Sequence, residues 1–506
     1  MTNIHPAFND LLQSFENYKD RIAIVDKDGT EYSYSDFKQH IVGAREILAQ
    51  KGIKKGDKIL VAVPMSLQLY AILEAILSMG AVAVFLDPWM KGKKMSAVIH
   101  QVKPDLFIVT KKIAKVSWLL RATWKLKKWK VDSIPPSSGE LSIATVEDND
   151  NALITFTSGT SGTPKGANRT FTFLQAQAEV LKSHLKRADD QPYVDYTNFP
   201  IVGLADFAMG NTVVIPRINL MKIHKADSDD IANHLIEVKA NRLIVSPSLL
   251  KRILIGLKGT NQNHHIAELV TGGAPISNEL ILNCLEELPT VKSEGIYGST
   301  ESEPICVTDF KQIKDKLQTP LKGVFVGQPV NEIEVKIVKW KNRPIETSEF
   351  ENLIKTDGEV GEVVVKGDHV NKHYYQNEAA FKANKIVDSN GEIWHRTGDM
   401  AYLENGDLYL VGRSHRIMRR QDKNFYPYPL EQFIEQKFGL TDLGYVKLTD
   451  GRFVLFIGPG KEVNSRAIKK AIEEAGYPID RIELCRKPLP RDARHKSKLQ
   501  VEELVG

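Results

Sequence analysis

The chain has 506 residues, of which 42% are hydrophobic and 26% charged, a globular composition with enough apolar residues for a large core. Its formal net charge of +5 suits an anionic substrate and is too small to indicate a nucleic-acid-binding protein. The three cysteines, Cys284, Cys306 and Cys485, match neither a disulfide framework nor a metal-ligand pattern, so we expect a reducing compartment. Residues 1–21 contain no apolar signal core, so we expect a cytoplasmic location.

From the N-terminus to Gly327, helical and strand patterns alternate along the chain. Segments with apolar residues at helical spacing are each followed by a short apolar run, which is typical of a buried strand. These pairs occur at 37–53 and 58–64, 71–81 and 83–88, 229–240 and 241–248, and 279–289 and 291–300. The alternation predicts an α/β fold with helix-covered, mostly parallel sheets.

The stretch 111–130 is rich in Lys and Trp and contains no acidic residue. As a helix it would be basic and amphipathic, a pattern that marks contact with a membrane surface, so the protein would then lie peripherally at the membrane. The alternative is a solvated face whose Trp side chains pack inward. Because the stretch is short and surface Lys is common, we favour this alternative.

The loop "TSGTSGTPKG" at 157–166 lies between a strand pattern at 152–156 and a helix pattern at 171–185. Its glycines let backbone N–H groups point into one concavity, where they bind anionic oxygens. Hydroxyl donors and one cation are added by Thr157, Ser158, Thr160, Ser161, Thr163 and Lys165. This predicts a polyphosphate site rather than a mobile linker. The loop is not a P-loop, because Pro164 precedes the Lys and Gly166 follows it.

The chain changes its pattern after Gly327. Residues 330–340 and 358–370 alternate with period two, which is typical of antiparallel strands in a β-rich subdomain. Beyond Gly412 we expect helices at 428–439 and 466–476 and a strand at 452–460. We therefore expect an N-terminal domain at 1–412 and a small α+β C-terminal domain at 413–506.

Four later stretches accompany the loop in order, namely "GGAPI" at 272–276, "YGSTES" at 297–302, 396–413 and 489–499. With these motifs the chain resembles the adenylate-forming superfamily of acyl-CoA synthetases, nonribosomal peptide adenylation domains and luciferases. The resemblance implies a large N-terminal domain, a small C-terminal domain on a hinge, and ATP and Mg²⁺ as cofactors. It makes the chain an AMP-forming acid ligase.

The resemblance also implies the contacts to the nucleotide. Gly272 and Gly273 allow adenine to approach the backbone, Tyr297 stacks on the base, and Asp399 and Arg413 contact the ribose. Further nucleotide-binding positions are Gly159, Gly162, Ala274, Pro275, Gly298 and Ser299.

The implied catalytic residues are Thr300, Glu301, Lys165 and a C-terminal Lys. Thr300 would bond the α-phosphate, and Glu301 is a hard oxygen ligand suited to Mg²⁺. Lys496 and Lys498 compete for the last role. We choose Lys498, because Leu499 and Leu504 follow it at the spacing of the family motif.

The implied reaction joins a fatty carboxylate to the α-phosphate of ATP, giving acyl-AMP and pyrophosphate, and then transfers the acyl group to coenzyme A. We assign the acyl pocket to Phe199, Ile201, Val202 and Leu204, within an apolar stretch where only Asp206 could serve an amino-acid substrate. At the hinge, Arg416 stands where Asp or Lys is expected, and Asp422 where Gly is expected.

These departures resemble one branch, the β-lactone synthetases of the bacterial olefin pathway. The stretches that carry this likeness are 85–95, 199–216, 412–417 and 491–499. In that branch the substrate's own hydroxyl displaces AMP, and no coenzyme A is needed. A hypothesis of another class is an inactive nucleotide-binding module, motivated by Arg416 and Asp422. It is disfavoured because Lys165, Glu301, Asp399, Arg413 and Lys498 are all present.

Overall fold

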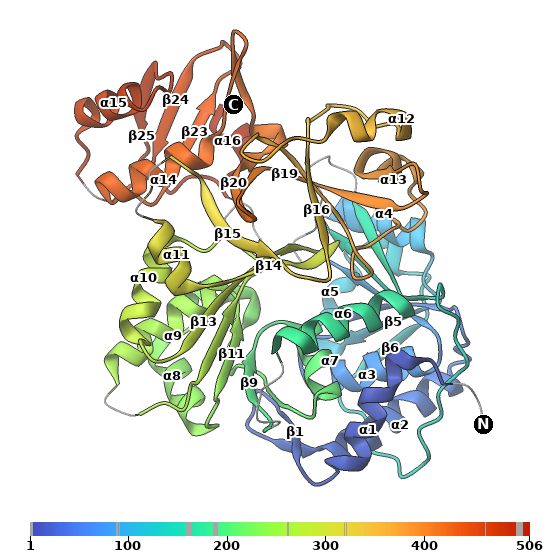
Figure 1. The fold of residues 1–506 in the computed structure, drawn as a ribbon. Coiled ribbons are helices and arrows are strands. Elements are labelled where there is room, and N and C mark those ends of the chain that lie inside the picture. Colours follow the sequence, from blue (N-terminus) through green and yellow to red (C-terminus); the bar gives the residue numbers. More distant parts are fainter. Residues whose placement is uncertain are drawn as a thin grey trace.

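The computed structural model describes residues 4–87, 90, 92–157, 164–185, 191–260, 263–317, 319, 321–460, 462–491 and 499–505. Helices cover two extended sheets, and a smaller C-terminal part sits at one end of them (Figure 1). This is the expected α/β architecture of a large sheet-based body with a small α+β part.

One sheet has the spatial order β6-β5-β3-β4-β7-β8. Its strands are β3 (Lys58–Ala62), β4 (Val82–Leu86), β5 (Leu106–Thr110), β6 (Lys128–Val131), β7 (Asn151–Thr157) and β8 (Lys165–Thr170). The pairs are parallel except for β7 and β8, which are antiparallel and bring Thr157 opposite Lys165. The predicted phosphate loop therefore begins and ends at the same edge of this sheet.

The other extended sheet has a parallel half and an antiparallel half. The parallel half is β1 (Ile22–Val25), β10 (Thr212–Val214), β9 (Val194–Thr197), β11 (Arg242–Val245), β12 (Glu268–Thr271) and β13 (Lys292–Ser299), with β2 (Glu31–Ser33) antiparallel at the edge. The antiparallel half is β14 (Ser302–Asp309), β15 (Val324–Pro329), β20 (Asp407–Arg413), β19 (Ile393–Glu404), β17 (Gly361–Lys366) and β16 (Glu334–Val338), with β18 (Lys385–Val387) on β19.

The period-two segments form antiparallel strands as expected, and these strands continue the sheet that the parallel strands begin. The hairpin of β13 and β14 makes the join, through the turn at Thr300 and Glu301. A period-two pattern indicates that one face of a strand is exposed. It does not indicate which other strand pairs with it.

The main core lies around α3 (Leu67–Ser78), a helix whose side chains are buried on nearly every side. Such a helix is apolar all round because it has no solvent face. Ser66 caps it by accepting from the Leu69 N–H. Beside it, α2 (Tyr34–Gln50) begins with a capping box between Ser33 and Asp36.

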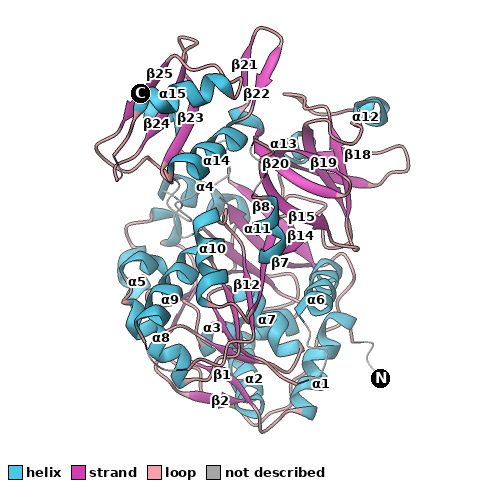
Figure 2. Cartoon of the chain, turned by 60° about the vertical axis from the view of Figure 1, so that its left-hand side comes forward, coloured by secondary structure: helices cyan, strands magenta, loops and turns pink. Residues whose placement is uncertain are grey.

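The remaining helices cover the sheets on both sides (Figures 1 and 2). Those before the hinge are α1 (Asn9–Asn17), α4 (Gly92–Val102), α5 (Lys111–Ser117), α6 (Phe171–Leu185), α7 (Pro200–Ala208), α8 (Ser228–Glu237), α9 (Pro247–Gly259), α10 (Asn278–Glu287), α11 (Phe310–Lys316), α12 (Thr347–Phe350) and α13 (Glu378–Asn384). Short 3₁₀ turns are η1 (Pro6–Phe8), η2 (Arg121–Thr123), η3 (Leu220–Lys225), η4 (Glu351–Leu353) and η5 (Ser414–Arg416). Among the described helices, none combines the length and apolarity that crossing a bilayer requires.

The C-terminal part packs around apolar clusters of its own. Its elements are the hairpin β21 (Met418–Arg420) and β22 (Lys423–Phe425), α14 (Pro427–Phe438), the sheet of β23 (Leu443–Lys447), β24 (Phe453–Ile457) and β25 (Arg481–Leu484), α15 (Ser465–Glu474) and α16 (Val501–Val505). The clusters draw only on residues from Met418 onward. This part therefore has the buried apolar surface of a separate folding unit.

In the segment 111–130 the favoured interpretation is correct for the exposed lysines and for Trp129 but wrong for the other two Trp side chains. The segment forms α5, η2 and β6 in succession rather than one helix. Trp129 is buried, whereas Trp118 and Trp124 are 62% and 58% exposed. Because the helix ends at Ser117, the positions after it no longer follow helical spacing, and these two side chains point outward.

Candidate active site

A cleft of ≈ 2630 Å³ lies where the two sheets and the C-terminal part meet. Its walls include the β13–β14 hairpin, the facing ends of β19 and β20, α7, α10 and α14. Most of the predicted site residues that the structure describes line it. Parallel strands end at this edge, which is where open α/β sheets place their ligands.

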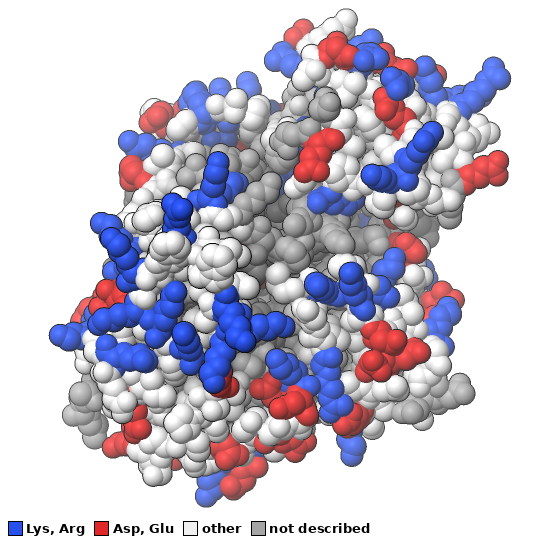
Figure 3. Space-filling model, turned by 180° about the vertical axis from the view of Figure 1, so that it is seen from behind, with Lys and Arg blue, Asp and Glu red and all other residues white. Residues whose placement is uncertain are grey.

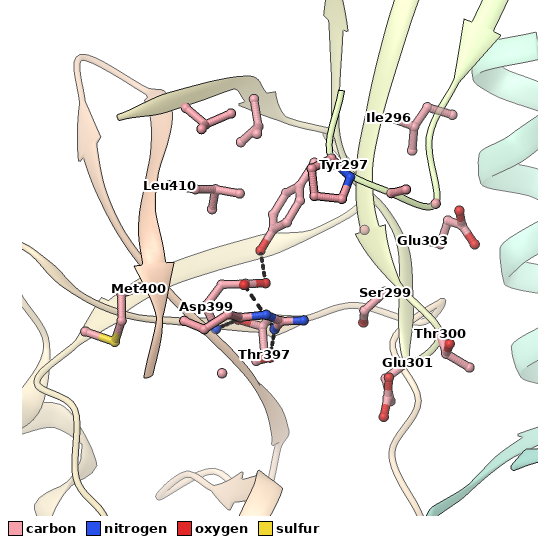
Figure 4. A pocket seen from close by; sticks show the side chains of 18 of the residues that line it. Ile296, Tyr297, Ser299, Thr300, Glu301, Glu303, Thr397, Asp399, Met400 and Leu410 are labelled. Carbon is pink, nitrogen blue, oxygen red and sulfur yellow. Dashed lines mark hydrogen bonds and ion pairs between the residues drawn. The ribbon is translucent and has the colours of Figure 1, made fainter. Parts of the chain in front are cut away.

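Tyr297, Asp399 and Arg413 form one hydrogen-bonded group in the cleft (Figure 4). The Tyr297 hydroxyl donates to Asp399 Oδ2 at 2.9 Å, and Arg413 lies 3.0 Å from Asp399 Oδ1. Burial and the neighbouring carboxylate raise the pKa of Tyr297 well above its ordinary value, so it remains a donor. The two acceptor oxygens of Asp399 are thereby held in a fixed direction.

The backbone explains why these residues meet. Asp399 on β19 stands directly opposite Arg413 on β20 in the antiparallel register. Gly398, with φ +73, turns the strand just before the carboxylate, and the Asp399 N–H donates to Thr397 Oγ1 at 3.0 Å. The motif "TGD" is thus a local kink that aims Asp399 into the cleft.

Thr300 and Glu301 form the turn between β13 and β14 and also line the cleft. Glu301 accepts from the Tyr374 hydroxyl at 3.1 Å, and the Glu301 carbonyl accepts from the Asn371 N–H at 2.7 Å. The Thr300 carbonyl accepts from Arg169 at 2.8 Å. The turn is therefore held from both sides, with its carboxylate kept at the cleft wall.

Arg169 is a site residue that the sequence interpretation missed. It lies on β8, on the same face of the strand as Lys165. It is nearly fully buried and lines the cleft. Its Nε atom and the Ser299 hydroxyl are buried and have no hydrogen-bond partner within the described structure. Unsatisfied buried donors beside a cleft fit an anionic ligand that would accept from them. The sequence did contain a signal for it: residues four apart in a strand share one face, so Arg169 should lie on the same side as Lys165.

Lys385 is a second missed cation. Its ammonium group donates to the Asn371 carbonyl and lies 5.2 Å from the centre of the Tyr374 ring, and Lys165 lies 6.0 Å from the same ring. Burial lowers the pKa of Lys385 to about 7. The positive charge of Lys165 lowers this pKa further, and the negative charge of Glu301 raises it. Lys165 donates to Asn384 Oδ1 at 3.0 Å, and burial also lowers its pKa. Lys385 is on β18 and Lys165 on β8, and no sequence pattern indicates that these two strands lie close together.

The segment after β12 brings Gly273, Ala274 and Pro275 to the cleft. Gly273 has φ +74, and a side chain there would approach the Phe199 ring at 3.3 Å. Gly272 lies deeper, against the Ile296 carbonyl, and does not line the main cleft. Gly298 is similarly close to the Ser302 carbonyl. Gly272 and Gly298 therefore allow neighbouring strands to pack closely, and of the two predicted adenine-binding glycines only Gly273 lines the cleft.

The apolar end of the cleft lies between α3, α6 and α7. Phe199, Ile201 and Leu204 line it as expected, together with side chains from α3 and α6. Val202 instead points to a small side cavity behind the cleft. Asp206 is fully buried, 3.2 Å from Arg242 and 3.1 Å from Asn211, so it does not serve as a partner for a substrate ammonium group.

Arg416, which the sequence interpretation placed at a hinge, is bound to the C-terminal part. It lies 2.7 Å from Glu431 on α14 and donates to the Tyr445 carbonyl at 3.1 Å. Asp422 is a fully exposed turn residue, and the left-handed conformation falls on Gln421, with φ +54. The position at 422 therefore has no steric need for Gly.

Several predicted residues lie outside the described structure. These are Ser158, Gly159, Thr160, Ser161, Gly162 and Thr163 of the loop, and both Lys496 and Lys498. Of Thr157, the structure describes only its place at the end of β7. The described neighbours of the two lysines, Arg491 and Leu499, pair with each other and line the cleft.

The donor set at Glu301 fits a magnesium ion that is shared with phosphates. Within the described part of the chain, His, Cys, Asp and Glu side chains form no group of three that could hold a metal alone. Mg²⁺ commonly takes one or two carboxylates and completes its shell with water and substrate phosphates. One carboxylate beside Lys165 and Lys385 matches that pattern.

Comparisons with known proteins agree with this geometry. A family model described as AMP-binding enzyme matches residues 11–375. An olefin β-lactone synthetase from Xanthomonas campestris is 28% identical over 73% of this chain and 70% of its own length. A 2-succinylbenzoate–CoA ligase from Bacillus cereus is 25% identical over 94% of both chains.

Solved structures support the fold. The amide bond synthetase McbA from Marinactinospora thermotolerans superposes with a TM-score of 0.81 over 99% of both chains, at 17% identity. The O-succinylbenzoate coenzyme A synthetase from Bacillus subtilis, in complex with ATP and magnesium, gives a TM-score of 0.79 at 21% identity, over 98% of this chain and 99% of that one.

Proposed function

This chain belongs to the AMP-binding enzyme family and is an AMP-forming acid ligase, and from that premise we propose that it activates a fatty carboxylic acid. The substrate carboxylate attacks the α-phosphate of ATP. The new bond joins the carboxylate oxygen to phosphorus, and the bond to the leaving pyrophosphate breaks, giving acyl-AMP. The acyl group then passes to coenzyme A, whose thiol replaces AMP at the acyl carbon.

One observation carries this proposal: a cluster of cations and an apolar channel open into the same cleft. Lys165, Arg169 and Glu301 line one end, and the buried Lys385 interacts electrostatically with Glu301 and Lys165 without itself lining the cleft. Phe199, Ile201 and Leu204 line the other end. Two anions must meet in the first step, so the barrier is largely electrostatic, and fixed cations lower it. The apolar wall suits an alkyl chain.

Each group around the nucleotide has a distinct part. Asp399 accepts from the ribose hydroxyls, Tyr297 and Arg413 orient that carboxylate, and Thr300 bonds the α-phosphate. Glu301 holds Mg²⁺, which neutralises charge on the phosphates when bound. The loop at 157–163 and Lys165 hold the leaving phosphates. Lys498 reaches the reacting carboxylate from the C-terminal part, and its neighbour Leu499 lies at the cleft.

The domain boundary at 412 to 413 serves a rotation between the two steps. Arg416 is fastened to α14 through Glu431, so it moves with the C-terminal part. The rotation point therefore lies before it, at Arg413 and Ser414. Turning the C-terminal part about this point would withdraw Lys498 and admit the acceptor thiol.

A β-lactone synthetase is the second candidate, favoured by the 28% identity to the Xanthomonas campestris enzyme. There the 3-hydroxyl oxygen of the substrate attacks its own acyl carbon. A C–O bond closes the four-membered ring, AMP leaves, and the hydroxyl proton passes to solvent. The first step and its residues are common to both candidates.

The test is mass spectrometry of the products from purified protein and Mg-ATP. A plain fatty acid and the matching 3-hydroxy acid are each supplied with and without coenzyme A. A thioester from the plain acid supports the ligase. AMP release with a dehydrated product from the hydroxy acid, independent of coenzyme A, supports the lactone. The absence of AMP with every acid would overturn both in favour of an inactive module.

A further inference from the structure

Four large apolar side chains are exposed together in the segment 111–130. Val116, Trp118, Leu119 and Trp124 are 57%, 62%, 69% and 58% exposed. We call these four, with the surrounding cations, the basic apolar surface. Elsewhere in the described chain, the exposed large apolar residues are Ile4, Met221, Ile255, Leu282 and Leu484, and no other segment carries two of them within ten residues. Contiguous exposed apolar groups of this kind mark an interaction site.

Other side chains of the same segment are buried in the core. Ile113, Ala114, Leu120 and Leu126 pack against the cluster under β3, β4 and β5, and Trp129 is buried on β6. The outward side chains are thus additional to those that packing needs. Folding alone gives no reason for two tryptophans on the solvent side.

The outward side chains are held in place by local bonds. Trp124 donates from its indole N–H to the Trp118 carbonyl at 2.6 Å. The Thr123 hydroxyl donates to the Ser117 carbonyl at 2.8 Å. The turn around η2 is therefore closed internally, with both Trp side chains more than half exposed and Arg121 5.9 Å from the centre of the Trp124 ring. A preformed surface loses less entropy on binding than a flexible one.

The charges around these side chains have one sign. The exposed cations are Lys112, Lys115, Arg121, Lys125, Lys127 and Lys130. None of the six forms an ion pair with another described residue, whereas Lys111 pairs with Asp132. Figure 3 shows Lys and Arg gathered around uncharged atoms on the back of the molecule. The partner must therefore be both anionic and apolar.

We propose that the basic apolar surface docks this enzyme on membranes that contain anionic lipids. Trp and Leu enter the interfacial layer, where amphipathic indole rings are favoured, and the Lys and Arg side chains contact the headgroups. The charge complementarity favours this partner over an ordinary protein face, since interface cores are depleted in Lys. The inference does not depend on which acid the enzyme activates.

The surface also lies next to the cleft. Leu120 packs within 3.7 Å of the place where a side chain at Gly92 would begin, at the start of α4. Met90 and Lys94, on either side of Gly92, line the cleft. Docking would therefore bring the cleft wall near the bilayer surface.

The test is flotation of the purified full-length chain with vesicles of phosphatidylcholine, with or without phosphatidylglycerol. We expect binding to the anionic vesicles that is lost at high salt, because exposed charges are screened. Lys112→Gln with Lys125→Gln should weaken it by roughly 10- to 30-fold. Trp118→Ser with Trp124→Ser should reduce it at least tenfold by a rough estimate.

The matched control is Ile255→Ser with Leu282→Ser, which removes exposed apolar groups elsewhere and should leave binding unchanged. Melting temperature and AMP release in detergent-free buffer show whether each variant is folded and active. Equal binding to neutral vesicles, or binding unaffected by the Trp and Lys variants, would overturn the proposal. So would a loss of self-association in the Trp variant without vesicle binding by the wild type, since a protein contact would then explain the surface.

Discussion

The hydroxyl of Tyr297 donates to Asp399 Oδ2 at 2.9 Å, although the two residues are 102 positions apart in the chain. Tyr297 comes from the last parallel strand of the large sheet, and Asp399 comes from its antiparallel half. β13 and β19 belong to one continuous sheet, and both strands line the cleft. The proposed nucleotide site therefore lies across the join between the two halves.

Asp399→Ala should weaken ATP binding by roughly 100-fold, because two ribose hydroxyls lose a charged acceptor. Isothermal titration calorimetry with ATP measures the change. Tyr297→Phe is the matched variant, since it removes only the hydroxyl that orients Asp399, and it should cost roughly tenfold or less. Unchanged ATP affinity in folded Asp399→Ala would contradict the assignment of this carboxylate to the ribose.

Glu301→Gln should raise the magnesium concentration needed for half-maximal ATP–pyrophosphate exchange by an order of magnitude or more, since an amide is a weaker ligand for a hard cation. The measurement is exchange rate against free Mg²⁺. Glu294→Gln on β13, the strand that leads into the turn of Glu301, is the control, because that side chain pairs with Lys292 away from the cleft. If both variants responded alike, Glu301 would not be the magnesium ligand.

Lys385→Met should lower the maximal rate of adenylation by roughly 10²-fold, since the protonated form of this buried lysine adds positive charge beside Lys165 and Glu301. The effect should fall on kcat more than on KM for the acid, which separates it from a general loosening of the fold. Lys382→Met provides the control, because Lys382 is an exposed cation on the neighbouring helix α13. Comparable losses in both variants would refute a special role for Lys385.

Lys498→Ala should lower the rate of acid-dependent pyrophosphate release by a factor on the order of 10²–10³, while ATP still binds. Lys496→Ala should retain most of the activity. Release of pyrophosphate and ATP affinity are measured on both variants in parallel. The reverse pattern would move the catalytic assignment to Lys496, and full activity in both would remove it from this tail.

The contact between α14 and α10 should weaken as the pH rises through 7. The pKa of Glu435 is raised to about 7 by burial and by the nearby carboxylates of Glu279 and Glu431. Because this value lies above the ordinary 4.5, the contact is most stable while Glu435 is protonated and loses stability as the group ionises.

Small-angle scattering at pH 6 and pH 8 measures the consequence, with a more extended molecule expected at the higher pH. Glu435→Gln keeps the shape of the side chain and removes the charge, so its radius of gyration should not respond. A variant that still extended with pH would show that another group controls the contact.

Composition and motif order were enough to predict the α/β fold and the family, and most of the described residues that they assigned to the site line the cleft. These features are local, because a strand end, a Gly-rich turn or a "TGD" kink depends on a few consecutive residues. Asp399 and Arg413 were found this way, although they meet only through the register of β19 and β20.

Only the tertiary structure decided which distant groups surround Glu301. Tyr374, Lys385 and Arg169 reach it from separate elements, and nothing in their sequence spacing indicates that they meet. Folding likewise decided that Trp118 and Trp124 face outward, because the chain leaves the helical path at Ser117. Sequence patterns encode the preference of each segment for one backbone period and one buried face. The contacts between segments depend on how those faces pack, which is a property of the whole chain.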